Sequence, residues 1–88
     1  MSDELEELRH EIESIDHDLV SLLARRVEVA RRIGGAKRQT GRPTLDPARE
    51  AAVVRRAGEL AREAGLDAEE VRELFWHVIG LSRRAQTH

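Results

Sequence analysis

The N-terminal part of the chain carries an apolar seam that is too long for a small monomer. Its apolar residues recur at alternating steps of three and four, the spacing of a helix that packs lengthwise against another helix. They are Leu5, Leu8, Ile12, Ile15, Leu19, Leu22, Val29, Ile33 and Ala36. This spacing predicts one helix from about residue 4 to about residue 38, ended by the Thr-Gly-Arg-Pro segment at residues 40–43.

Such a helix measures about 52 Å at roughly 1.5 Å per residue. A compact chain of 88 residues has a diameter of only about 30 Å. The helix therefore extends beyond its own domain while its seam stays apolar. The chain also has no cysteine, so no disulfide compensates for a small core. These features predict a homodimer in which a second copy covers the overhang.

Two shorter helices follow, and the alternating pattern of β-strands is absent. Asp46 and Pro47 form a typical N-cap and first helical residue, and Gly65 suits the position after a helix C-terminus. Asp67 and Glu70 form an acidic variant of the capping box, which opens the third helix. The expected fold is all-α, with three helices per chain in a single domain of residues 1–88.

The composition argues against several classes of protein. A net charge of −2 and only two aromatic residues make nucleic-acid binding improbable. No run of about 18 apolar residues predicts a membrane span, and the acidic N-terminus is unlike a signal peptide. The four histidines (His10, His17, His77 and His88) are too scattered to share a metal ion. We expect a cytoplasmic protein without a metal, a cofactor or a membrane partner.

Charge interrupts the seam at Arg26, four residues after Leu22. Burying an unpaired guanidinium costs several kcal/mol, so Arg26 needs an internal acidic partner, a route for its stem to the surface, or a bound anion. Lys37, the only lysine in the chain, lies about 20° from Arg26 around the helix and roughly 16 Å along it. Two cations thus share one inward face, and side chains of this length can reach opposite sides of one small ligand.

The two shorter helices also carry polar residues near this face. Ser82 and Gln86 lie one turn apart and continue the apolar stripe of the third helix. They either fray into solvent at the chain end or donate hydrogen bonds into the same cavity as the two cations. Asp46, Arg49 and Glu50 share the first turn of the second helix, where Asp46 acts as the cap and the other two are compatible with ordinary surface charge.

Six short motifs, in this order, resemble the all-helical class of chorismate mutases. They are L-R-x-x-I-x-x-I-D at residues 8–16, L-L-x-x-R at 22–26, A-K at 36–37, R-P-x-x-D at 42–46, R-E at 49–50 and S-x-x-x-Q at 82–86. Each motif is weak alone, but together they cover nearly the whole chain. The resemblance implies that three helices per chain interlock into a six-helix homodimer, whose first helix spans both active sites.

The resemblance further implies which residues bind the two substrate carboxylates. Arg26 and Arg9 would clamp them as planar forks, and Arg49 and Ser82 would complete the contacts. Arg9 and Arg26 are 17 positions apart, which is roughly 25 Å along one helix and about 100° around it. They cannot grip one small molecule from the same chain. If both bind it, Arg9 must come from the partner.

The remaining roles concern the reacting atoms. By resemblance, Lys37 and Gln86 would donate to the ether oxygen, where negative charge grows as the C–O bond breaks. Glu50 would accept a hydrogen bond from the ring hydroxyl, assisted by the backbone around Asp46. The implied reaction is the rearrangement of chorismate to prephenate, a step toward phenylalanine and tyrosine. It needs no nucleophile, no proton transfer and no cofactor.

Three alternatives stay open. The same scaffold hosts isochorismate–pyruvate lyases and 4-amino-4-deoxychorismate mutases, whose substrates are dicarboxylates of nearly the same shape. The surroundings of Glu50, which reads the ring substituent, are the place to look for a difference. A purely structural helical dimer would explain the seam but not the cations at positions 26 and 37. We expect no appended domain, and control by docking of another enzyme is left undecided.

Overall fold

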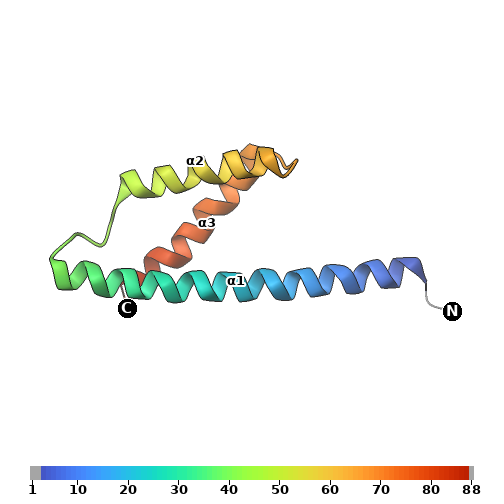
Figure 1. Cartoon of the computed structure of the whole chain (residues 1–88), viewed down its shortest axis with the longest axis horizontal. Helices are drawn as coiled ribbons and strands as arrows, with labels where there is room; N and C mark the ends of the chain where they lie inside the picture. Colours follow the sequence, from blue (N-terminus) through green and yellow to red (C-terminus); the bar gives the residue numbers. More distant parts are fainter. Residues whose placement is uncertain (1–2, 88) are drawn as a thin grey trace.

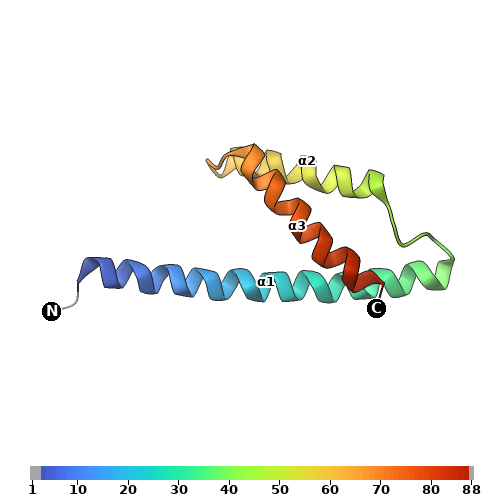
Figure 2. The same cartoon turned by 180° about the vertical axis from the view of Figure 1, so that it is seen from behind.

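The computed structural model describes residues 3–87 and contains three helices. They are α1 (Glu4–Thr40), α2 (Pro47–Glu63) and α3 (Ala68–Gln86). Helix α1 forms a rod along one side of the molecule, α2 runs back along its C-terminal half, and α3 returns diagonally to α1 (Figure 1). Helix α3 packs against both other helices, as the reverse view also shows (Figure 2). The predicted all-α chain with a very long first helix is confirmed.

Local capping chemistry sets the ends of α1. The Asp3 side chain accepts a hydrogen bond from the Leu5 amide at 3.1 Å. At the other end Gly41 adopts the left-handed conformation (φ 72°), which lets the Arg42 amide donate to the Lys37 carbonyl at 2.9 Å. The helix therefore runs to Thr40, two residues beyond the predicted end, and Gly41 of the predicted Thr-Gly-Arg-Pro segment terminates it.

The caps of α2 and α3 confirm the other predicted boundaries. Asp46 accepts from the Arg49 amide at 3.1 Å, and Pro47 is the first helical residue. Gly65 (φ 76°) lies just after α2, where the Leu66 amide donates to the Ala61 carbonyl at 2.8 Å. Asp67 accepts from the Glu70 amide at 3.0 Å and so opens α3. Each cap satisfies backbone groups that a helix end leaves without an intrahelical partner.

The core of the single chain is thin. Its buried apolar residues are Ala30, Val54, Ala57, Ala61, Ile79 and Ala85. Most of these are alanines, so the helices approach closely but remove little apolar surface from water. The radius of gyration is 16.7 Å, whereas a compact chain of this length has about 12 Å.

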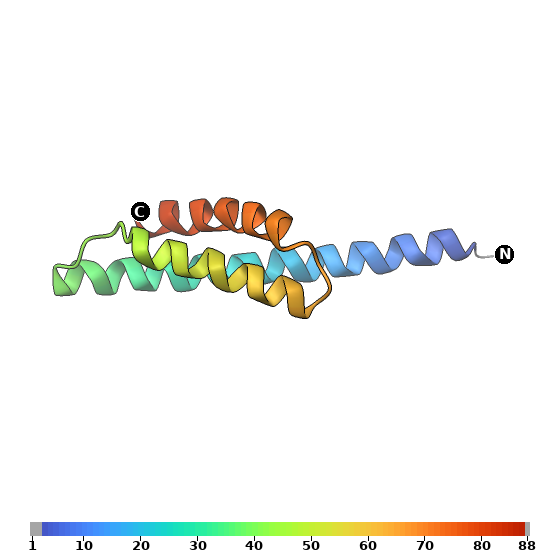
Figure 3. The same ribbon diagram turned by 90° about the horizontal axis from the view of Figure 1, so that it is seen from above.

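The N-terminal half of α1 projects beyond the other two helices (Figure 3). Its seam residues Leu5, Leu8, Ile12, Ile15, Leu19 and Leu22 are each between 49% and 57% exposed. Farther along the same seam, Val29 and Ile33 are each 44% exposed. The predicted overhang is therefore present, and the chain's own α2 and α3 do not cover it.

Candidate active site

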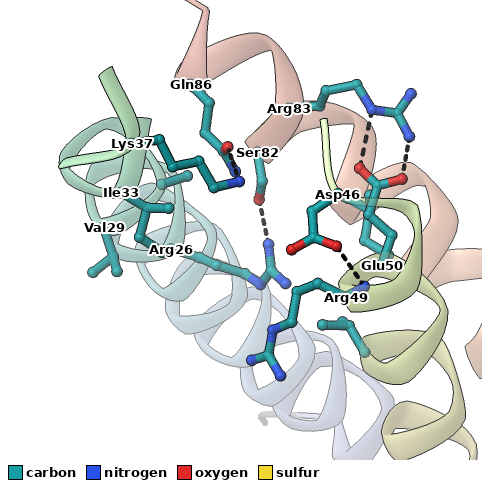
Figure 4. Close-up of a pocket in the computed structure, with 13 residues that line it drawn as sticks. Arg26, Val29, Ile33, Lys37, Asp46, Arg49, Glu50, Ser82, Arg83 and Gln86 are labelled. Carbon is teal, nitrogen blue, oxygen red and sulfur yellow. Dashed lines mark hydrogen bonds and ion pairs between the residues drawn. The ribbon is translucent and has the colours of Figure 1, made fainter. Parts of the chain in front are cut away.

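A pocket of about 320 Å³ opens between the C-terminal half of α1, the start of α2 and the end of α3. Its polar lining residues are Arg26, Lys37, Asp46, Arg49, Glu50, Ser82, Arg83 and Gln86, and its apolar lining residues are Val29, Ala30, Ile33, Val53 and Ile79. Figure 4 shows the polar side chains of all three helices around this space. Seven of the eight predicted site residues line the pocket, and only Arg9 does not.

The pocket carries an excess of positive charge. Four cations and two carboxylates are among its lining residues, which leaves a formal charge of +2. The volume lies at the lower end of the range for small-molecule sites. A small dianion therefore matches the pocket in both charge and size.

Arg26 reaches from α1 to α3, where its guanidinium donates to the Ser82 hydroxyl oxygen. Ser82 is only 7% exposed and donates in turn to the Val78 carbonyl at 3.2 Å. Among the residues that the structure describes, Arg26 forms no ion pair. The interpretation of Arg26 as half of an internal ion pair is therefore wrong, and its charge remains available to an anion in the pocket.

Lys37 and Gln86 meet on one side of the pocket. The Lys37 ammonium donates to Gln86 Oε1 at 3.0 Å and to the Thr44 carbonyl at 2.9 Å. An ammonium has three protons and accepts nothing, so one Lys37 proton is left for a ligand. The Gln86 oxygen has to face this donor, which leaves the Gln86 amide NH₂ to donate elsewhere. Two donors on this side of the pocket are thus free for a ligand.

The last turn of α3 is anchored to α1. Arg38 Nη1 donates to the Gln86 carbonyl at 2.7 Å. A Cβ added to Gly34 would lie 2.5 Å from the Gln86 carbonyl oxygen and 2.8 Å from Gln86 Cα, so this crossing requires glycine. The interpretation of Gln86 as a frayed residue is wrong, because the residue is half-buried and ends a formed helix.

Glu50 of α2 pairs with Arg83 of α3, an interaction that sequence reasoning missed. Arg83 Nε lies 3.1 Å from Glu50 Oε2, and Arg83 Nη2 lies 2.5 Å from Glu50 Oε1. The Glu50 side chain is 18% exposed and that of Arg83 is 47% exposed. The hydrogen bond to Glu50, and then its negative charge, raise the pKa of Arg83. Glu50 is therefore a pocket residue held in place rather than ordinary surface charge.

Two further predicted residues belong to the first turn of α2. Asp46 acts as the N-cap while also lining the pocket. Arg49 extends toward α1, so that Arg26 and Arg49 approach the pocket from opposite sides (Figure 4). Neither guanidinium has a carboxylate partner within residues 3–87. The charges of both arginines are therefore available to carboxylates of a ligand.

Arg9 lies on the projecting part of α1, outside the pocket. Its Nη1 lies 3.8 Å from Glu6 Oε1, and both side chains are exposed. Arg9 does not reach the pocket of its own chain. This agrees with its predicted distance from Arg26 along the helix. Its arrival from a partner chain stays a prediction.

Neither a cluster of three or more metal-ligating side chains nor a membrane-spanning helix occurs among the described residues. No group of three or more His, Cys, Asp or Glu side chains within residues 3–87 is placed to hold a metal ion. His88 lies outside the described residues. Over the same stretch, no helix has the length and apolar character needed to span a bilayer.

Comparison with known proteins identifies related chains. The chain is 34% identical over 67 residues to the chorismate mutase of Methanocaldococcus jannaschii, covering 76% of this chain and 68% of that protein. It is 33% identical over 72 residues to the 4-amino-4-deoxychorismate mutase of Streptomyces venezuelae, covering 82% and 70%. It is also 35% identical over 71 residues to the T-protein of Haemophilus influenzae, covering 81% of this chain but only 19% of the T-protein.

A solved structure supports the fold. The conserved hypothetical protein from Pyrococcus furiosus superposes with a TM-score of 0.77 and 37% identity, and the match covers 98% of this chain and 99% of that one. The family model for chorismate mutase type II matches residues 8–87, which include every residue of the pocket. The chain belongs to the chorismate mutase type II family.

Proposed function

We propose that this chain is a chorismate mutase, which rearranges chorismate to prephenate in the biosynthesis of phenylalanine and tyrosine. The observation that carries the proposal is the pairing of Lys37 with Gln86 beside two arginines without carboxylate partners. One side of the pocket thus offers free donors for a developing negative charge, and the other offers two cations for carboxylates. The family and the chorismate mutase of M. jannaschii support the same activity.

The chemistry asks little of the protein beyond position and charge. Within one molecule the ether C–O bond breaks and a new C–C bond forms, so no group enters or leaves. Arg26 and Arg49 hold the carboxylates and keep the substrate in its compact reactive shape. Lys37 and Gln86 donate to the ether oxygen as its negative charge grows, which stabilises the transition state more than the ground state. Arg26 contributes to catalysis through this binding, because it holds the substrate in the reactive shape.

The proposal includes a homodimer, which the exposed seam of α1 supports. The core positions of this seam are symmetrical about the point between residues 20 and 21. Residues whose numbers add to 41 therefore face each other when two copies lie antiparallel. The resulting pairs are Leu5 with Ala36, Leu8 with Ile33, Ile12 with Val29, Ile15 with Arg26, and Leu19 with Leu22. This register covers the whole overhang with a second copy of the same surface.

The same register supplies the missing arginine. The partner's Arg9 would lie opposite position 32, beside Ile33, which lines the pocket. A third guanidinium then joins Arg26 and Arg49 near the substrate carboxylates. Six interlocked helices would form two sites, each using residues of both chains. The proposed location is the cytoplasm.

Product analysis tests the activity and separates it from the alternatives on the same scaffold. The purified chain is incubated separately with chorismate, isochorismate and 4-amino-4-deoxychorismate, and the products are identified by NMR and by a pyruvate assay. We expect prephenate from chorismate without pyruvate, and the highest kcat/KM for this substrate. Pyruvate release from isochorismate would identify a lyase, and faster turnover of the amino compound would identify the other mutase. If none of the three compounds is turned over, the structural helical dimer is the remaining alternative.

A further inference from the structure

Arg83 occupies the outer wall of the pocket and binds Glu50 through two nitrogens. Its Nε and Nη2 each contact a different carboxylate oxygen, at 3.1 and 2.5 Å. A carboxylate has about four acceptor positions, two on each oxygen, and this fork uses one on each. Glu50 therefore still has an acceptor position on each oxygen for a ligand.

The pair changes the charge that a ligand meets at Glu50. A lone carboxylate attracts an ammonium group more strongly than a hydroxyl, because a full charge adds to the hydrogen bond. Here the guanidinium of Arg83 balances that carboxylate. A ligand nitrogen bound to the free position of Glu50 would lie within about 5 Å of the guanidinium, given two hydrogen bonds through one carboxylate. An ammonium would be repelled there, whereas a neutral hydroxyl would not.

The other charges around the pocket add to this repulsion. Arg26, Lys37 and Arg49 are all cationic, and they outnumber Asp46, the remaining carboxylate, which accepts the Arg49 amide as the cap of α2. The pocket thus suits a ligand whose only charges are negative. Discrimination of this kind comes from an element that disfavours the competitor as well as from attraction of the correct ligand.

We propose that Arg83 is a specificity-determining residue, which through its pairing with Glu50 selects a dicarboxylate bearing a ring hydroxyl over one bearing a ring ammonium. The inference rests on the proposed function, because it takes Glu50 as the group that reads the ring substituent. It assigns the preference for chorismate over 4-amino-4-deoxychorismate to Arg83, which occupies an unspecified position of the S-x-x-x-Q motif at residues 82–86.

A competition experiment tests the assignment. Chorismate and 4-amino-4-deoxychorismate are mixed with the full-length protein at pH about 6.5, where an amino group of ordinary pKa is charged. The ratio of the two kcat/KM values is measured for the parent, Arg83→Gln and Arg83→Lys. If the amino compound is not turned over, its inhibition constant against chorismate replaces its kcat/KM. Arg84→Gln is the matched control, since it removes the same charge one residue away, outside the pocket lining.

We expect Arg83→Gln to shift the ratio toward the amino compound by about tenfold or more. Arg83→Lys keeps the positive charge and should keep most of the discrimination. Arg84→Gln should change the ratio by less than about twofold. If Arg83→Gln does not fold, Arg83→Met removes the same charge and serves in its place. A purely structural role for Arg83 would lower both rates together and leave the ratio constant. That result contradicts the inference while the mutase activity stands, whereas a parent that forms no prephenate removes the proposed function itself.

Discussion

Lys37 Nζ lies 3.0 Å from Gln86 Oε1, although 49 positions separate the two residues in the sequence. The contact joins the last turn of α1 to the last turn of α3 and fixes which way the Gln86 amide points. Because lysine only donates, the amide nitrogen is left for an acceptor in the pocket. This pair defines the part of the site where negative charge can develop during a reaction.

Gln86→Glu tests that arrangement through pH. A glutamine amide donates at any ordinary pH, whereas a glutamate side chain donates only when it is protonated. We expect kcat of the variant to fall by about 100-fold or more at neutral pH, the size of effect seen when one transition-state donor is lost, and to rise again as the pH falls. The parent should show no such rise.

Gln39→Glu provides the control for this experiment, because Gln39 is exposed and does not line the pocket. Its kcat should follow that of the parent at every pH. Folding is checked by circular dichroism at each pH. Equal, flat profiles for the parent and Gln86→Glu would remove Gln86 from the mechanism.

Gly34→Ala should weaken both the fold and the site. The new Cβ would lie 2.5 Å from the Gln86 carbonyl oxygen, and a backbone atom cannot swing aside as a flexible side chain can. We expect a loss of about 1–3 kcal/mol in the free energy of unfolding, typical of overpacking, together with a lower kcat as α3 moves away from Lys37. Denaturant unfolding and steady-state kinetics give the two values.

Gly35→Ala is the natural comparison, because the nearest atom to its added Cβ is an Arg38 nitrogen at 3.9 Å. Replacing this helical glycine should stabilise the protein by up to about 1 kcal/mol and leave kcat unchanged. If both alanine variants behave alike, close approach at Gly34 is not what positions Gln86.

Arg9→Ala and Arg26→Ala should complement each other. Each homodimer lacks one of the two arginines at both sites and should be nearly inactive. A heterodimer has one site with both arginines and one with neither, so co-refolding the two variants should restore a substantial fraction of parental activity. Native mass spectrometry establishes that heterodimers are present. A mixture that stays inactive despite them would show that both residues serve the site of a single chain.

The register of the proposed dimer predicts a specific cross-link. The chain contains no cysteine within the described residues or elsewhere in its sequence, so engineered cysteines meet no competing thiol. Ile12→Cys mixed with Val29→Cys should form an intermolecular disulfide, because these positions face each other within roughly 7 Å in the antiparallel pair. Neither variant should cross-link alone. Cross-linking within one variant, or a monodisperse active monomer in sedimentation, would contradict the register.

The features that could be predicted from the sequence are those encoded locally. Helical periodicity and cap residues such as Asp46 and Gly65 depend on a few neighbouring positions, and they gave the three helices correctly. The same periodicity predicted that Arg26 and Lys37 share a face, because both lie on one helix, and both line the pocket. The motifs of the family resemblance supplied the residues from the other helices.

The features that could not be predicted depend on how α3 crosses the other helices. The pairing of Glu50 with Arg83 and the anchoring of Gln86 by Arg38 join positions more than thirty residues apart. No local pattern specifies which of fourteen arginines meets a given carboxylate. Gly34 did leave a signal, since a glycine pair inside a long helix is costly unless close packing requires it.

The central claim is that this cationic pocket rearranges chorismate, and the initial rate of prephenate formation tests it most directly. The rate is measured for the purified parent, for Lys37→Ala and for Arg31→Ala, whose charge lies on the exposed face of α1 in a pair with Glu28. We predict that the parent forms prephenate, that Lys37→Ala lowers kcat by about 100-fold or more, and that Arg31→Ala stays within about twofold of the parent. A parent that forms no prephenate, or a Lys37→Ala variant with parental kcat, would contradict the claim.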